Sequence, residues 1–150
     1  MPIRVYALDN QQIPNPIEVV EGMIPVFHHL ASALMDSGAT HSFVDPNFMN
    51  GIYVKCDFLP FYLGVKTPTG NQCLIANKVY RNCDIWVGDR KLLADLMSLT
   101  IKGNDVILGM DWLARYLAQL DCKIKLVELR IPGEATLKLD VRGRLASSAL

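Results

Sequence analysis

The chain has 150 residues, of which 51% are hydrophobic, enough for one domain with a proper core. Fifteen basic and fifteen acidic side chains give a formal net charge of zero, and no basic block stands out, which argues against electrostatic binding to nucleic acid. No apolar run is long enough to span a bilayer and no signal-peptide core precedes Asp9, so we expect an intracellular, cytoplasmic protein without a membrane partner.

The cysteines and histidines give no metal-binding pattern. There is no C-x-x-C pair and no histidine at zinc-finger spacing, and the doublet His28-His29 would point to opposite faces of a strand. We therefore expect no metal and no cofactor. The cysteines are interpreted as reduced thiols, with a disulfide as the less favoured alternative; they are Cys56, Cys73, Cys83 and Cys122.

The first third of the chain predicts strands. Residues 1–16 contain a short strand from Ile3 to Leu8 and then a loose link with two prolines. Two further strands, Ile17–Val26 and Leu30–Met35, form a hairpin with His28-His29 at its connection. The turn lacks the strong Asn-Gly signal, but the hairpin leads directly to Asp36.

The segment that follows this hairpin carries the most specific motif. The apolar run Ala33–Met35 delivers the carboxylate of Asp36 onto a Ser-Gly turn, and Phe43-Val44 returns the chain to apolar surroundings. A plain surface turn is the bland alternative, but both flanks are apolar. The pattern hydrophobic-hydrophobic-Asp-Ser-Gly-Ala resembles the active-site loop of aspartic proteases. The continuation ATHSFV is similar to retropepsins of gypsy-type LTR retrotransposons.

This resemblance implies a role for each residue of the loop. Asp36 is the implied catalytic residue, and Ser37 bonds across a two-fold axis to lock two copies of the loop together. Gly38 allows the two loops to approach each other closely. Ala39 stands where other acid proteases carry a hydroxyl beside the carboxylate. His41 is expected to be a loop residue near the site rather than a base.

Beyond the loop, the resemblance also implies a flap. Asp45–Gly51 predicts one short helical turn, with Asp45 at the N-cap and Gly51 at the stop. Short strands, Phe61–Val65 and Gln72–Ile75, flank a polar insert that resembles the retropepsin flap, which closes over bound peptide. An ordinary β-hairpin is the alternative. The insert consists of Lys66, Thr67, Pro68, Thr69, Gly70 and Asn71.

The next segments predict a hairpin and a support strand. Val79–Val87 and Lys91–Leu99 flank a turn at residues 88–90; the second segment would also suit a helix, and the resemblance favours a strand. In retropepsins a hydrophobic-hydrophobic-Gly strand passes behind the catalytic loop into a short helix. Val106, Ile107, Leu108 and Gly109 match that strand, and Asp111–Tyr116 matches the helix.

The C-terminal part predicts two more strands, Cys122–Leu129 and Leu137–Val141, and residues 142–150 look like a frayed end. The chain then divides into residues 1–16, a strand and link; residues 17–131, the retropepsin-like domain; and residues 132–150, a strand and tail. The fold class is all-β, a retroviral-type acid protease fold with a closed β-barrel-like half and one short helix.

Acid-protease chemistry needs two carboxylates that face one water and share one proton. This chain has one Asp-Ser-Gly loop. Other aspartates do not begin a second one, because the residue that follows is Trp after Asp111, Cys after Asp121 and Val after Asp140. The resemblance therefore implies a homodimer in which Asp36 of each copy meets on the axis.

The expected function is an aspartic endopeptidase that cleaves the Gag-Pol polyprotein of a retroelement, acting in the cytoplasm or in the retroelement particle. The alternative is a catalytically idle retropepsin-like module that dimerises or binds peptides. Serine or cysteine catalysis lacks a G-x-S-x-G elbow, a zinc hydrolase lacks H-E-x-x-H, and a β-barrel nucleic-acid binder lacks a basic aromatic face.

Overall fold

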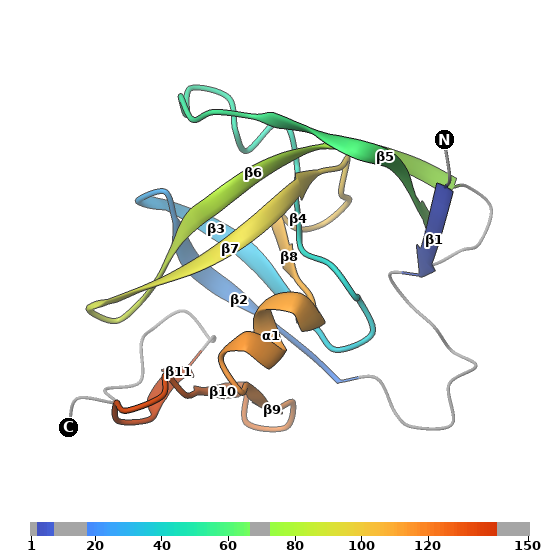
Figure 1. The fold of residues 1–150 in the computed structure, drawn as a ribbon. Helices are drawn as coiled ribbons and strands as arrows, with labels where there is room; N and C mark the ends of the chain where they lie inside the picture. The colour runs from blue at the N-terminus through green and yellow to red at the C-terminus, as the bar shows by residue number, and fades with distance from the viewer. Residues whose placement is uncertain (1–2, 8–17, 67–72, 141–150) are drawn as a thin grey trace.

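A computed structural model describes residues 3–7, 18–66 and 73–140. Apart from one short helix, the regular elements of these residues are strands (Figure 1). The elements are β1 (Ile3–Ala7), β2 (Val19–Val26), β3 (His29–Asp36), β4 (Phe43–Val44), β5 (Asp57–Lys66), β6 (Cys73–Val87), β7 (Arg90–Ser98), β8 (Val106–Leu108), α1 (Met110–Arg115), β9 (Gln119–Asp121), β10 (Leu126–Leu129) and β11 (Leu137–Asp140).

Six of these strands close into a barrel. The order is β6-β2-β3-β8-β4-β7, and β7 pairs back onto β6. β5 pairs with the first half of β6, and β1 adds to β5 in parallel at the outer edge (Figure 1). A separate small sheet has the order β11-β10-β9. The predicted mostly β fold with a closed barrel and one short helix is confirmed.

The β2–β3 hairpin delivers the chain to Asp36. Its ladder runs from Val26↔His29 at the turn to Val19↔Asp36 at the open end. Phe27 and His28 form the turn, both with positive φ (51° and 63°), which is the geometry of a tight primed hairpin turn without its usual Asn-Gly sequence. Along β3 alternate side chains are buried, which places the residue before Asp36 in the core.

The second hairpin is longer than predicted. The sequence predicts separate strands at Gln72–Ile75 and Val79–Val87, but Cys73–Val87 is the single strand β6; Gln72 lies outside the described residues. The register shifts between Phe58 and Leu63 on β5, and it shifts again between Tyr80 and Cys83, where β6 pairs with β7. Lys66 is the last residue of β5 and is exposed, while the rest of the predicted flap, residues 67–71, lies outside the described residues.

The turn after β4 and the helix after β8 agree in outline with the elements predicted from the sequence. Residues 45–51 form successive i→i+3 turns rather than an α-helix, with Gly51 at φ 83°. α1 begins one residue earlier than predicted and ends at Arg115. β7 is a strand as predicted, so its helical propensity is overridden by pairing with β4 and β6.

The predicted strand Cys122–Leu129 is confirmed only from Leu126 onward. Residues 122–125 are a turn between β9 and β10, and only Leu126–Leu129 is a strand. The Asp121 carboxylate accepts the backbone N–H groups of Lys123 and Ile124, at 3.1 and 3.3 Å, and Lys125 has φ 55°. An aspartate that bonds its own following backbone stabilises a turn, and this local bond outweighs the apolar alternation of the segment.

The division of the chain at residues 16 and 131 stays a prediction. Both flanking strands nevertheless pair with strands inside 17–131: β1 with β5, and β11 with β10.

Two hydrophobic clusters fill the molecule. The larger one fills the barrel and extends to α1 and the C-terminal sheet, with Met35, Leu108 and Trp112 among its buried members. The smaller one lies under the β5–β6 hairpin and contains Ala39 and Phe43. The loop after Asp36 therefore runs from one cluster into the other. Within the described residues, no helix is long and apolar enough to cross a membrane.

Candidate active site

Asp36 is the last residue of β3, and its side chain is only 3% exposed in the single chain. The chain folds back around the carboxyl group at once. The Gly38 N–H donates to Asp36 Oδ1 at 2.8 Å, and the Ala39 N–H donates to the Asp36 backbone carbonyl at 3.2 Å. A buried carboxyl group held by its own loop has a fixed orientation, as a reacting group requires.

Ser37 is bonded to the residue that precedes β2. Its backbone N–H donates to the Glu18 carbonyl at 3.0 Å, and its Oγ accepts the Glu18 N–H at 2.8 Å. The β2–β3 ladder thus continues one step beyond Asp36. A hydroxyl that accepts one bond still has its proton to donate. The predicted bond across a two-fold axis stays a prediction, whereas the bond to Glu18 is a contact that the sequence analysis missed.

The predicted support strand lies behind the loop. β8 pairs in parallel with β3 and antiparallel with β4, so it lies between the two strands that the loop connects. Val106, Ile107 and Leu108 are all buried. Leu108 is the strand-pairing partner of Met35, the residue just before Asp36. The structure therefore brings the support strand and Asp36 together.

Gly109, the residue after β8, packs closely against the backbone of the loop that follows Asp36. A Cβ at this position would lie 2.7 Å from the Ala39 carbonyl oxygen and closer still to that of His41. The following residue, Met110, donates its N–H to the same Ala39 carbonyl at 2.7 Å. The loop can rest on the start of α1 only because residue 109 has no side chain.

A polar network around the buried Ser42 hydroxyl, which no sequence motif predicted, fixes the far end of the loop. The Ser42 side chain is fully buried; its Oγ donates to Asp111 Oδ1 at 2.7 Å and accepts the Gly109 N–H at 3.0 Å. Asp111 Oδ1 also accepts the Trp112 N–H at 2.8 Å. The sequence signal was weak: a serine directly before the apolar pair Phe43-Val44 and an aspartate in the first turn of a helix.

Comparison with known proteins identifies the family. The model of the family described as retroviral aspartyl protease matches residues 1–134. The chain belongs to the retroviral aspartyl protease family. Among solved structures, the retroviral protease-like domain of Ddi1 from Leishmania major matches with a TM-score of 0.58 at 15% identity, covering 83% of this chain and 96% of that chain. At this identity the match supports the fold alone. No curated protein matches the chain.

In this retroviral-type protease domain, the structure gives no support to serine, cysteine or zinc-dependent hydrolysis. The Ser42 hydroxyl donates to a carboxylate, and the His41 ring bonds through Nδ1 with Thr40 Oγ1 at 2.9 Å. Burial raises the pKa of the Cys83 thiol to about 12, so this cysteine stays protonated and is not a nucleophile. Within the described part of the chain, no three His, Cys, Asp or Glu side chains gather as metal ligands.

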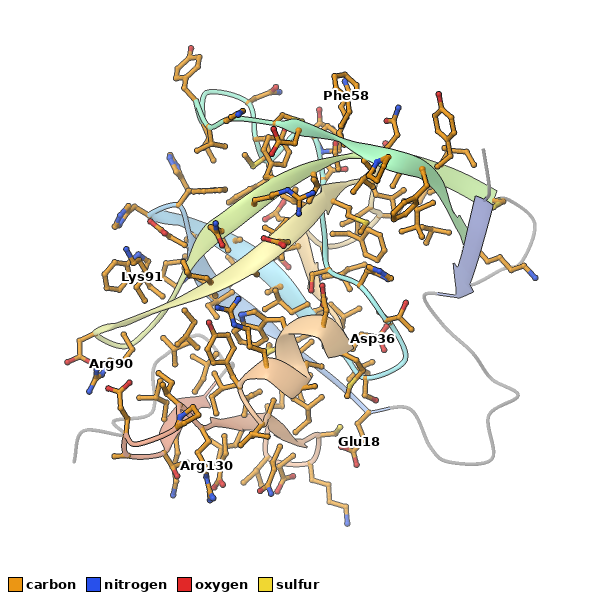
Figure 2. The ribbon with its side chains drawn as sticks, viewed as in Figure 1. Glu18, Asp36, Phe58, Arg90, Lys91 and Arg130 are labelled. Carbon is orange, nitrogen blue, oxygen red and sulfur yellow. The ribbon has the colours of Figure 1, made fainter. Side chains whose placement is uncertain are left out.

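The side of the loop that carries Ser37 opens onto an apolar hollow. This hollow has a volume of about 700 Å³, and Glu18, Ser37, Met110 and Leu117 are among its lining residues. Met110 is 40% exposed and Leu117 59% exposed. Figure 2 shows Glu18 and Asp36 on the same side of the molecule, next to α1. The loop with the candidate catalytic carboxyl thus borders an exposed apolar surface.

Proposed function

We propose that the protein is an aspartic endopeptidase whose active site forms from two copies of the chain, with one Asp36 from each. The observation that carries the proposal is the Asp36 carboxyl group, buried at the end of β3 and held by the Gly38 N–H, in a chain of the retroviral aspartyl protease family. One chain supplies one such loop. Two facing carboxyl groups require a second copy related by a two-fold axis.

In this proposal the pair of carboxyl groups holds one proton, because two carboxylates in contact resist double ionisation. The ionised Asp36 removes a proton from the attacking water, and the protonated Asp36 donates a hydrogen bond to the carbonyl oxygen of the scissile peptide. The water oxygen bonds to the carbonyl carbon and gives a tetrahedral intermediate. Proton transfer to the amide nitrogen then breaks the C–N bond and leaves a carboxylic acid and an amine.

The proposed substrate is a polyprotein of a gypsy-type retroelement, processed in the cytoplasm or in the retroelement particle. The support is the similarity of the ATHSFV continuation to that group of retropepsins. The segment 66–71 is proposed as the flap over the bound peptide, because in the sequence it connects the paired strands β5 and β6 and falls between the candidate catalytic loop and the support strand.

Asp36→Asn is expected to lower peptide hydrolysis by at least about 10²–10⁴-fold while the fold and most of the dimer persist, since the change is nearly isosteric and removes the general base from both halves. The assay follows cleavage of a Gag-derived peptide with and without a pepstatin-type inhibitor. Asp89→Asn, an exposed change in the β6–β7 turn, is the control. Turnover near wild type in the Asp36→Asn variant would reject Asp36 as the catalytic residue. A wild-type dimer that never cleaves would reject the enzyme and favour an idle module.

A further inference from the structure

The N-terminal strand β1 covers one edge of β5. Its ladder with β5 is parallel and runs from Ile3↔Tyr62 to Ala7↔Lys66. On its other side β5 pairs with β6, and among the described strands β5 is the one partner of β1 (Figure 1). An uncovered strand edge presents backbone N–H and C=O groups with which an extended peptide can pair. β1 therefore lies where such a peptide would bind to β5.

This edge of β5 lies close to the candidate catalytic loop. Leu63 and Val65, which pair with residues of β1, are fully buried and belong to the same hydrophobic cluster as Ala39 of the loop. The pairing ends at Lys66, the first residue of the proposed flap. In the proposed peptidase, a peptide held between the loop and the flap would run along the edge that β1 covers.

The segment that joins β1 to β2 has its two ends on the two parts of this candidate site. β1 ends beside Lys66, and β2 begins with Val19, the strand-pairing partner of Asp36. The backbone N–H and C=O of Glu18, just before β2, both bond to Ser37. The N-terminal part of the chain is thus anchored on the flap strand at one end and on the catalytic loop at the other.

The attachment of β1 can be reversed without opening the barrel. β1 is five residues long, pairs with one strand and is not one of the barrel strands β6-β2-β3-β8-β4-β7. Parallel pairing is slightly less stable per residue than antiparallel pairing, and segments with few partners open at a low cost in free energy. A peptide that pairs with β5 can therefore displace β1 while the barrel and the Asp36 loop stay intact.

We propose that β1 is an autoinhibitory strand: in the free protein it occupies the edge of β5 from Tyr62 to Lys66, and a substrate peptide must displace it to reach Asp36. This inference rests on the proposed function, because it concerns access to the same site. It goes beyond that function by naming a competitor within the chain. Such a competitor raises the KM by the factor by which it reduces the fraction of open sites, and it leaves kcat unchanged.

A chain of unchanged length tests the competition. Ile3–Ala7 is replaced by Gly-Ser-Gly-Ser-Gly, which disfavours a strand. We expect the KM for the Gag-derived peptide to fall at least about threefold, with kcat unchanged, because more sites are then open. The same replacement at residues 143–147, near the other end of the chain, is the matched control and should change neither constant.

Sedimentation and thermal unfolding are measured on both replacement variants. A KM that stays the same or rises when β1 is replaced would overturn the proposal. A loss of activity that accompanies a weaker dimer or a less stable fold would also overturn it, because β1 would then support the structure rather than block the site.

A reversible disulfide tests the same point with β1 in place. Ile3→Cys and Tyr62→Cys put two cysteines at facing positions of the ladder, and neighbouring strands lie about 4.7–4.9 Å apart, within the range of a disulfide. The natural cysteines that are exposed or half-buried are first changed to serine; they are Cys56, Cys73 and Cys122. We expect oxidation to lower peptide cleavage at least about tenfold, and a thiol reductant to restore it.

Each of the two cysteine variants alone is the control, and its activity should not respond to the oxidant. Mass spectrometry of the digested, unreduced protein shows whether the link has formed. A linked protein that cleaves as fast as its reduced form would overturn the proposal. Failure of the link to form would also overturn it, because β1 would then not be held on β5 in this register.

Peptide binding without cleavage separates this inference from the proposed function. In Asp36→Asn chains, replacement of β1 should lower the Kd of the Gag-derived peptide by the factor seen in the KM. A peptidase whose KM and peptide Kd ignore β1 would overturn this inference and leave the proposed function intact. A chain that never cleaves, but whose peptide Kd falls when β1 is replaced, would overturn the proposed function alone.

Discussion

At the scale of single residues, the candidate catalytic loop depends on two buried side chains, Asp36 and Ser42, that are held by hydrogen bonds. Asp36 is held by the Gly38 N–H at the start of the loop, and Ser42 is held by Asp111 and the Gly109 N–H at its end. The loop is therefore fixed at both ends by hydrogen bonds that are buried or partly buried. Such bonds stabilise modestly when formed, but losing one partner leaves the other unsatisfied and buried.

Ser42→Ala is expected to destabilise the protein by about 1–3 kcal/mol, because it leaves the buried Gly109 N–H without its partner, whereas the exposed Asp111 can bond water instead. Urea unfolding measures the change, and peptide cleavage should fall with it. Thr100→Ala removes an exposed hydroxyl and serves as the control, with an expected change within about 0.5 kcal/mol. Equal midpoints for the two variants would show that the network contributes no stability.

The cysteines should differ sharply in reactivity. Burial favours the neutral thiol of Cys83 and raises its pKa to about 12, whereas Cys73 and Cys122 are exposed. At about pH 8 an alkylating reagent should modify the two exposed cysteines quickly and Cys83 only after unfolding, because the thiolate is the reactive form. Mass spectrometry of the labelled peptides measures the rate of modification at each cysteine. Labelling of Cys83 at the rate of Cys122 in the native protein would contradict its burial.

At the scale of elements, the site is a loop between β3 and β4 that is packed on the start of α1. The contact works because Gly109 lets the carbonyl groups of Ala39 and His41 come close. β8, which ends just before this glycine, pairs with both strands that the loop connects. Loop, strand and helix therefore form one unit in which a side chain at residue 109 has no space.

Gly109→Ala is expected to destabilise the protein by at least about 3 kcal/mol or to displace the loop, since the new Cβ would meet backbone atoms that cannot move alone. Gly103→Ala is the comparison: it has open space around it but φ 89°, so it should cost only about 1–2 kcal/mol. Thermal unfolding of both variants is the measurement. A smaller loss at residue 109 than at residue 103 would refute the close packing.

The sequence predicted the elements that have strong local signals. The β2–β3 hairpin, the Asp36 loop and the Val106–Leu108 strand follow from apolar periodicity and from a motif with fixed spacing. It did not predict the turn at residues 122–125, where one aspartate side chain decides against a strand. Nor did it predict the bond between Ser42 and Asp111, which are 69 residues apart, because such partners are paired by the fold rather than by any local pattern.

At the scale of the whole molecule, one chain forms a closed barrel with one candidate catalytic carboxyl group at its edge. The surface beside that group is apolar and includes Met110 and Leu117. An exposed apolar patch next to an incomplete site is typical of a protein–protein interface. The proposed peptidase activity therefore requires a second copy of the chain, which contributes the second Asp36.

Subunit mixing tests this claim most directly. Wild-type chains are combined with equal amounts of Asp36→Asn chains at constant total concentration, under conditions in which subunits exchange, and peptide cleavage is measured. If each active site needs Asp36 from both copies, only dimers of two wild-type chains cleave, and activity should fall to about a quarter of the wild-type value. Activity of about half, proportional to the wild-type fraction, would contradict the shared site.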